Sequence, residues 1–260
     1  MNRSIIEATV FQGSSLSARR IEAGVVELCF DRQDGSPNKL DRTTIAQLNQ
    51  ATTRIVRING LTGLLITSAN AAFVVGADIK EFLQLFAMEE AEVARDMRGA
   101  GDVFRAIEDL PVPTIAAING YALGGGFELA LACSMRVMAS NAQVGLPEVK
   151  LGLVPGAGGH VRLPRVAGSV AAIEWITSGR SFEARAAVAV GAVDDQVDPA
   201  DLRASAMRML SRAMEGEIDW QERRRAKCAP VAIEPAAIAR AYAEARRALT
   251  VEAGPRSAGA

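Results

Sequence analysis

Short apolar runs alternate with longer amphipathic stretches over the first part of the chain. The apolar runs are bounded by turn residues and predict strands at 24–30, 61–67, 114–118, 135–139 and 143–145. Residues 43–58 repeat apolar side chains at three- and four-residue spacing, which predicts an amphipathic helix, and a second helix is expected at about 89–110. This alternation indicates an α/β fold, with a mostly parallel sheet and helices on its faces.

The pattern changes beyond residue 156, where Ala, Arg and Glu dominate and strand-like runs become rare. Helices are expected there at about 168–178, 183–190, 199–214 and 234–249. We therefore divide the chain into an α/β core, residues 1–195, and a helical C-terminal region, residues 196–260. The last residues, 251–260, are expected to fray.

Composition and charge exclude several classes of protein. The 29 Lys and Arg residues balance 30 Asp and Glu residues, and this net charge of −1 argues against nucleic acid or an anionic membrane as the main partner. The single histidine, His160, excludes a histidine-rich metal site, and Cys29, Cys133 and Cys228 form no CxxC pair, so no metal is expected. No apolar run approaches the roughly 20 residues of a membrane span, and no secretory signal is evident, so the expected location is the cytoplasm.

Two glycine clusters precede helical segments and are candidates for ligand binding. Neither LGGGFELALA, residues 123–132, nor GLVPGAGG, residues 152–159, fits the spacing of a phosphate loop or of a dinucleotide fingerprint, so a dinucleotide-dependent reductase is disfavoured. Three successive glycines at a helix start let backbone N–H groups approach a ligand closely, which suits an oxygen that gains negative charge during a reaction. The alternative is a tight turn packed against the sheet.

Four charged residues beside the glycines could take part in chemistry. Glu128 and Glu148 are solitary acids in apolar stretches that follow consecutive strand-like segments, and the ends of such strands meet where ligands bind. Paired carboxylates in a dry cleft can divide acid and base roles, although Glu128 could also merely complement a helix dipole. Asp78 is equally compatible with a helix N-cap, and a solvated surface side chain is the default interpretation of Lys80.

Taken together, three segments resemble the crotonase (enoyl-CoA hydratase/isomerase) superfamily. They are FVVGADIKEF, residues 73–82, AAINGYALGGGFELALAC, residues 116–133, and VGLPEVKLGLVPGAGGHVRLPRVAG, residues 144–168. Within the superfamily the wording is most similar to the N-terminal hydratase/isomerase region of multifunctional fatty-acid-oxidation α-subunits, and the resemblance covers roughly residues 20–229.

The resemblance implies a crotonase (ClpP-like) fold, which is a spiral of ββα units with a helical C-terminal region that serves oligomerisation. It implies acyl-CoA thioesters as ligands, with coenzyme A as part of the substrate and no separate cofactor. By position, the oxyanion-hole amides are those of Ala77 and Gly125, and the catalytic acids are Glu128 and Glu148. The residues expected to bind substrate or CoA are Lys39, Gly76, Asp78, Ile79, Lys80, Gly124, Pro147 and Gly156.

The activity that the resemblance implies is that of a 2-enoyl-CoA hydratase, a hydro-lyase, because both acids are present. A Δ3-Δ2-enoyl-CoA isomerase, another crotonase-type acyl-CoA lyase and a non-catalytic partner subunit are the alternatives. Phe82, Phe86 and Met97 either shape an acyl pocket or are ordinary core residues. A homo-oligomer, a trimer or hexamer, is expected. Because the sequence stops before the helices that usually help to enclose CoA, a partner subunit that completes the pocket is the other possibility.

Overall fold

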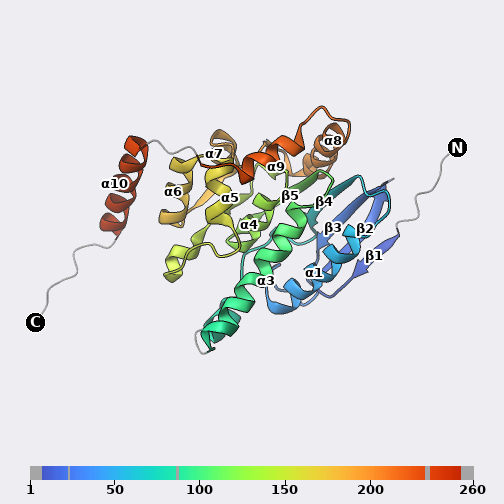
Figure 1. Ribbon diagram of the computed structural model, residues 1–260, viewed down its shortest axis with the longest axis horizontal. Coiled ribbons are helices and arrows are strands. Elements are labelled where there is room, and N and C mark those ends of the chain that lie inside the picture. Colours follow the sequence, from blue (N-terminus) through green and yellow to red (C-terminus); the bar gives the residue numbers. More distant parts are fainter. Residues whose placement is uncertain (1–7, 23, 86–87, 232–234, 253–260) are drawn as a thin grey trace, which may run out of the picture.

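The computed structural model describes residues 8–22, 24–85, 88–231 and 235–252. Three residues considered for an acyl pocket fall outside this description, Phe86 as a whole and Phe82 and Met97 by their side chains. The chain is elongated, with the first strands at one end and the last described helix at the other (Figure 1).

In the described residues the main sheet has seven strands, and their spatial order follows the chain, while three further strands form a second sheet. Its strands are β1 (Thr9–Gln12), β2 (Leu16–Glu22), β3 (Val25–Phe30), β4 (Gly63–Ser68), β5 (Thr114–Ile118), β7 (Met135–Ala139) and β10 (Asp195–Val197). The first three strands are antiparallel, and those from β3 to β10 are parallel. The four long predicted strands are confirmed to within two residues, whereas β1, β2 and β10 were not predicted.

A second, smaller sheet lies above the main one and contains β6 (Tyr121–Leu123), β8 (Gln143–Gly145) and β9 (Ser181–Glu183). β6 and β8 are parallel, and single bridges extend the layer through Val74–Ala122 and Leu40–Ala77. Consecutive strands β5 and β6, like β7 and β8, therefore contribute one strand to each layer. This is the spiral of ββα units that was expected.

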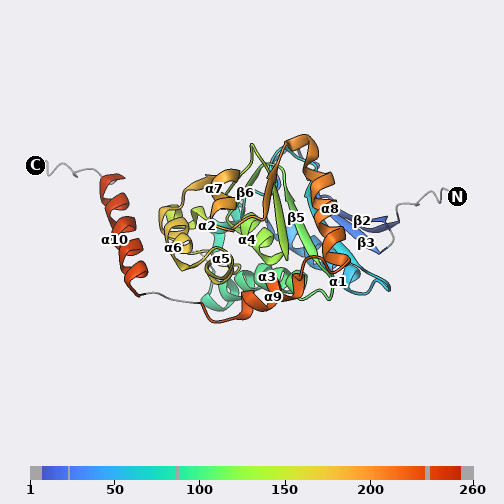
Figure 2. The same ribbon diagram turned by 90° about the horizontal axis from the view of Figure 1, so that it is seen from above.

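The helices lie around the two sheets, and some of them cover each face of the main sheet. They are α1 (Arg42–Val56), α2 (Ile79–Leu85), α3 (Glu90–Glu108), α4 (Gly125–Ala132), α5 (Gly159–Val166), α6 (Ser169–Ser178), α7 (Ala184–Ala189), α8 (Leu202–Met214), α9 (Trp220–Cys228) and α10 (Pro235–Glu252), with 3₁₀ turns η1 (Pro147–Leu151) and η2 (Pro199–Asp201). α1 and α3 pack together on one side, whereas α8 packs on β4, β5 and β7 from the other (Figure 2).

Local sequence explains where the first helix begins and which side it buries. Asp41 is the N-cap of α1, and its carboxylate accepts a hydrogen bond of 2.7 Å from the Thr44 amide. The buried positions Leu48, Ala51 and Ile55 recur at helical spacing and face the core, as the sequence predicted.

The short helix α4 lies between the two sheets and is central to the fold. Every residue from Gly126 to Ala132 is buried, and apart from Glu128 the segment is composed of glycine and apolar residues. A helix that is apolar on all sides is buried on all sides. Glu128 is therefore an acid placed in the interior of the protein.

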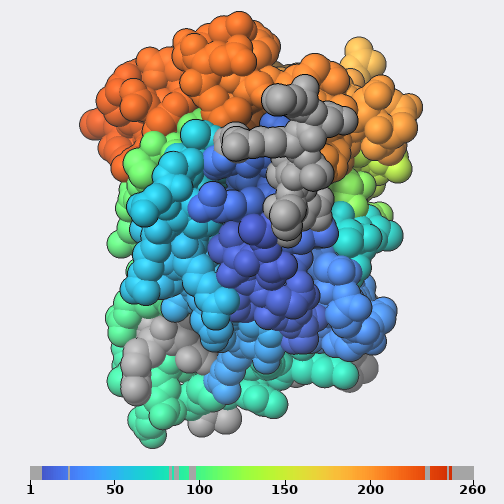
Figure 3. All heavy atoms as spheres, turned by 90° about the vertical axis from the view of Figure 1, so that its right-hand side faces the viewer, coloured from blue at the N-terminus to red at the C-terminus, as the bar shows by residue number. Residues whose placement is uncertain are grey.

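The C-terminal helices occupy two places. α8 and α9 lie on the body, and α8 borders the face where the dark blue N-terminal strands are exposed (Figure 3). α10 packs beside α6, at the end of the molecule far from β1 (Figures 1 and 2). In the described residues, no helix combines the length and apolar character needed to cross a lipid bilayer.

Candidate active site

Residues 73–77 are held by backbone hydrogen bonds on both sides. The Leu40 amide donates to the Gly76 carbonyl at 2.8 Å, and the Val74 amide donates to the Tyr121 carbonyl at 3.1 Å. Gly76 has a φ of +96°, a conformation that side chains disfavour, and it turns the chain so that Ala77 follows at the edge of the small sheet. The position of the Ala77 amide is thus fixed by two neighbouring strands.

The glycine run that starts α4 meets this turn backbone to backbone. Gly124 has a φ of +52° and is the N-cap of α4, so that the Gly125 amide is the first of the helix. A Cβ atom added to Gly76 would lie 3.0 Å from the Leu123 carbonyl oxygen, and one added to Gly124 would lie 3.8 Å from the Gly76 Cα. The segments that carry Ala77 and Gly125 are therefore adjacent.

The two amides that were expected to form an oxyanion hole have no acceptor in the part of the chain that the structure describes. Among the described residues, neither the Ala77 nor the Gly125 amide donates a hydrogen bond. Gly125 is also at the N-terminus of a helix, where unpaired N–H groups and the helix dipole favour negative charge. Both features suit an oxygen that becomes anionic.

Glu128, one turn into α4, is only 2% exposed. Its Oε1 atom accepts hydrogen bonds from the Ala157 amide at 2.8 Å and the Gly159 amide at 2.7 Å. Burial raises the pKa of Glu128, and these two amides oppose the rise. One carboxylate oxygen is thereby fixed, whereas Oε2 lies 3.9 Å from where a Cβ atom on Gly125 would be.

Glu148 lies on η1, the turn that follows β8, and its carboxyl group is adjacent to the same glycines. Its Oε1 atom lies 3.1 Å from where a Cβ atom on Gly124 would be. Its Oε2 atom is buried and has no hydrogen-bond partner among the described residues. Burial first, and then repulsion from Glu128, raise the pKa of Glu148 to about 7. The structure thus brings the two acids together at the end of β6 and β8.

The predicted CoA-binding residues fall into three groups, of which Lys39 and Asp78 form the last. Gly76, Gly124 and Pro147 belong to the segments just described, Pro147 as the first residue of η1. Ile79 and Lys80 are exposed at the start of α2, and Gly156 is exposed before α5. The structure does not bring Lys80, Ile79 or Gly156 into a hydrogen bond or ion pair with the acids.

Asp78 and Lys39 form an ion pair that the sequence analysis did not predict. Lys39 Nζ lies 2.7 Å from one carboxylate oxygen of Asp78, and the other accepts from the Lys80 amide at 2.9 Å. The lysine pair and this amide both lower the pKa of Asp78. The carboxylate therefore serves as the N-cap of α2, one of the two roles considered for it, and it orients Lys39.

Sequence reasoning missed the groups that hold Glu128. The cluster at 152–159 was compared with phosphate-binding loops, and Gly156 in it was expected to bind substrate or CoA, yet two of its amides bind a carboxylate of this chain. His160, in the first turn of α5, is exposed, and its Nδ1 lies 2.6 Å from the Pro155 carbonyl oxygen. The density of glycines in this segment indicated that its backbone amides could bind an anion. It did not indicate that the anion would be the side chain of Glu128, 29 residues before Ala157.

Other features of the described residues do not add to the site. No group of three or more His, Cys, Asp or Glu side chains in this part of the chain is arranged to hold a metal ion. A separate open hollow of about 620 Å³ lies against α9, and none of the predicted site residues lines it. Its two arginines already have acidic partners, Arg224 in Asp109 and Arg225 in Asp219 and Glu222.

The arrangement combines two anion-stabilising amides with two acids of raised pKa, the buried Glu128 and the half-buried Glu148. Such a site can stabilise an oxyanion while a carboxyl group with a pKa near neutrality accepts or returns a proton. This is the chemistry of proton transfer next to a carbonyl group.

Comparison with known proteins places this geometry in context. The family described as Enoyl-CoA hydratase/isomerase matches residues 20–244. The fatty acid oxidation complex subunit alpha of Colwellia psychrerythraea is 44% identical over 245 residues, which cover 94% of this chain and 34% of that protein. The corresponding subunit of Pseudomonas syringae pv. syringae is 43% identical and is also covered to 34%. The chain thus spans about a third of the length of these relatives.

Among solved structures, an enoyl-CoA hydratase from Bacillus anthracis has a TM-score of 0.72 and 30% sequence identity, with 90% of each chain covered. The similarity therefore extends over nearly the whole of both chains.

Proposed function

The chain belongs to the enoyl-CoA hydratase/isomerase family, and we propose that it hydrates 2-enoyl-CoA thioesters at the site formed by α4, η1 and residues 73–77. The predicted crotonase fold is confirmed by the two-layered sheet and by the similarity to solved hydratases. One observation carries the proposal: the buried Glu128 and the half-buried Glu148, both with a raised pKa, converge on two amides that have no acceptor among the described residues.

In the proposed reaction the amides of Ala77 and Gly125 hold the thioester oxygen. Adding water across the C2–C3 double bond places negative charge on this oxygen as an enolate forms. Donors that are already oriented stabilise that charge without reorganisation, and loss of one such donor typically costs about 2.7–4 kcal/mol.

The two acids take different parts because their surroundings differ. Glu128, held through Oε1, orients the attacking water with Oε2. Glu148, whose Oε2 has no hydrogen-bond partner among the described residues, removes a proton from that water while the hydroxyl bonds to C3. The same proton then passes to C2 and restores the carboxylate, so that water is added and nothing else is consumed.

A second candidate is isomerisation of 3-enoyl-CoA to 2-enoyl-CoA. The unpartnered oxygen and near-neutral pKa of Glu148 favour it, because one such carboxyl group can move a proton between C4 and C2. The same amides would hold the enolate. In this case Glu128 would not be needed for proton transfer.

Binding and assembly follow from the same proposal. The CoA part of the substrate would contact Lys39, Asp78, Ile79, Lys80 and Gly156 at the rim, with no cofactor beyond the CoA of the substrate. Residues 196–260 would serve oligomerisation, as a homotrimer or hexamer. The names of the relatives, subunits of a complex, support a partner subunit as the alternative.

The mechanism predicts the effect of removing each acid. Glu128→Gln and Glu148→Gln should each lower kcat for hydration of crotonyl-CoA by at least about 100-fold, because a positioned acid–base group contributes roughly 10²–10⁴ in rate. Loss of the conjugated-thioester absorbance measures the rate. Glu174→Gln, which changes an exposed glutamate on α6, is the control and should retain activity.

Full activity in both variants would disprove the assigned mechanism. Assaying 3-enoyl-CoA beside 2-enoyl-CoA, with products identified by mass, separates the two candidates. An isomerase without hydratase activity would reverse the ranking, and a protein that neither binds nor converts either thioester would be a non-catalytic subunit.

A further inference from the structure

Arg162, Glu108 and Lys227 form a network of charges near Glu128 that the proposed chemistry does not use. Arg162 on α5 donates to Glu108 Oε2 through Nε at 3.0 Å and Nη2 at 2.8 Å. Lys227 on α9 lies 2.8 Å from the other oxygen of Glu108. The side chains of Arg162 and Lys227 are 8% and 4% exposed. Burying three charges is costly, so their arrangement calls for a physical reason.

Arg162, at one end of this network of charges, holds the loop that binds Glu128. Arg162 Nη1 donates to the Ala157 carbonyl at 2.9 Å, and the Ala157 amide donates to Glu128 Oε1. The guanidinium also packs on Gly158, since a Cβ atom there would lie 2.2 Å from Nη1. Arg162 thus fixes residues 157–159 from the side opposite to Glu128.

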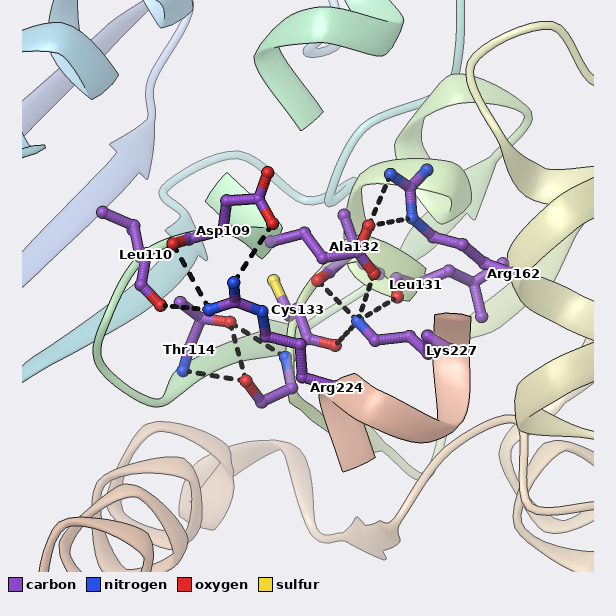
Figure 4. A network of polar contacts seen from close by, with 12 residues as sticks. Asp109, Leu110, Thr114, Leu131, Ala132, Cys133, Arg162, Arg224 and Lys227 are labelled. Atoms are coloured by element: carbon purple, nitrogen blue, oxygen red, sulfur yellow. Dashed lines mark hydrogen bonds and ion pairs between the residues drawn. The ribbon is translucent and has the colours of Figure 1, made fainter. Parts of the chain in front are cut away.

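The other end holds the helix that carries Glu128. Lys227 Nζ donates to the carbonyls of Leu131, Ala132 and Cys133 at 3.1, 2.7 and 3.0 Å. Figure 4 shows the lysine pointing at these carbonyls, with the Arg162 guanidinium nearby. They are the carbonyls at the C-terminal end of α4, where a cation is favourable. Loop and helix are therefore both tied to Glu108.

We propose that Arg162 is a positioning residue for Glu128: through the Ala157 carbonyl it keeps two amides on Oε1 and so leaves Oε2 as the oxygen that faces the reacting water. The proposal rests on the proposed function for its kinetic consequence. Its geometric part, that Arg162 controls the surroundings of the Glu128 carboxyl group, does not.

The kinetic test compares two arginines of the same helix. Arg162→Gln should lower kcat for crotonyl-CoA hydration by roughly 10- to 100-fold with KM changed less than about two-fold, because misplacing a catalytic group affects the chemical step. Arg165, which donates to the Ala229 and Val161 carbonyls and does not contact residues 157–159, provides the control. Arg165→Gln should leave kcat unchanged.

A double-variant comparison shows whether Arg162 acts through Glu128. In the Glu128→Gln background, Arg162→Gln should cause little further loss of kcat, since the group it positions is already disabled. An equal fold-loss in both backgrounds would overturn the proposal.

A titration that needs no substrate separates this proposal from the proposed function. With ¹³C-labelled glutamate, the Glu128 carboxyl signal is assigned by its disappearance in Glu128→Gln. Its pKa should be higher in Arg162→Gln than in the wild type, because a nearby positive charge is lost, and unchanged in Arg165→Gln. If the wild type converts no enoyl-CoA, the proposed function is wrong, and the titration alone then shows whether Arg162 controls the surroundings of Glu128.

An unchanged Glu128 titration together with an unchanged kcat in folded Arg162→Gln would overturn the proposal. If Arg162→Gln does not fold, Arg162→Lys replaces it, because a lysine keeps the charge but cannot form all three hydrogen bonds. The kinetic criterion then decides: kcat should fall as expected for Arg162→Gln, and an unchanged kcat overturns the proposal. If neither variant folds, the network is structural and the assignment is rejected.

Discussion

At the scale of single residues, Glu148 places a carboxyl group where the folded protein disfavours its charge. Burial and the neighbouring Glu128 raise its pKa from 4.5 to about 7. A group of this kind is poised to exchange protons near neutral pH, but it costs stability once it is ionised. The feature that suits catalysis therefore weakens the fold.

This conflict predicts that removing the Glu148 charge stabilises the protein at high pH but not at low pH. Between about pH 4.5 and 7 the folded chain binds more protons at Glu148 than the unfolded chain, so stability from this group is lost as the pH rises through about 7. Glu148→Gln should raise the free energy of unfolding at pH 8 by on the order of 1 kcal/mol and leave it unchanged at pH 4. Urea unfolding at the two pH values measures this. Equal effects at both would contradict it.

At the scale of elements, the start of α4 depends on the absence of side chains. A Cβ atom on Gly126 would lie 2.0 Å from the Val74 carbonyl oxygen, a backbone atom that cannot move aside without disturbing residues 73–77. By contrast, Gly99 in α3 has open space around its Cβ position. Packing therefore requires glycine at position 126 but not at position 99.

Replacing these glycines should have opposite effects on stability. Gly126→Ala should destabilise the protein by at least about 2 kcal/mol through overpacking and should also lower activity. Gly99→Ala should stabilise it by about 0.5–1 kcal/mol, because glycine is a poor helix former. Thermal unfolding measures both changes. A tolerated Gly126→Ala would mean that α4 and Val74 are less closely packed than described.

The elements that sequence predicted are those with a strong apolar pattern of their own. The buried strands β4 and β5 and the amphipathic α1 are of this kind. The missed elements lack such a pattern: β2 contains Arg19 and Arg20, α5 contains Pro164 within the helix, and the sequence of α9 is mostly polar. Their conformations are determined by tertiary contacts, which periodicity does not report.

The site divides in the same way. Glycine runs and solitary acids marked Gly125, Glu128 and Glu148 locally, and resemblance assigned their expected roles. The hydrogen bonds from Ala157 to Glu128 and from Arg162 to Glu108 join residues 29 and 54 positions apart. No local pattern predicts which of many buried polar groups will meet across such distances.

At the scale of the whole molecule, Lys227 connects the C-terminal region to the core. It is the buried cation of α9 and contacts α3 through Glu108 and the end of α4 through three carbonyls. Burial lowers its pKa to about 8. The division at residues 195 and 196 stays a prediction, but α9 and the core share this tie.

Removing the tie should affect the entire fold. Lys227→Met should lower the free energy of unfolding by on the order of 3 kcal/mol, since it leaves carbonyls and part of Glu108 without a buried partner. Arg225→Met removes exposed ion pairs from the same helix and should cost less than about 1 kcal/mol. Denaturant midpoints at constant slope compare them, and equal effects would refute the role of Lys227.

The contact between Gly76 and Gly124 also limits how this protein can diversify. Because the backbones of these two segments touch with no side chain between them, a side chain introduced there would push the segments apart. If the proposed function holds, preference for one acyl group over another must then arise from other residues around the two acids, whereas the backbone that receives the thioester oxygen stays the same.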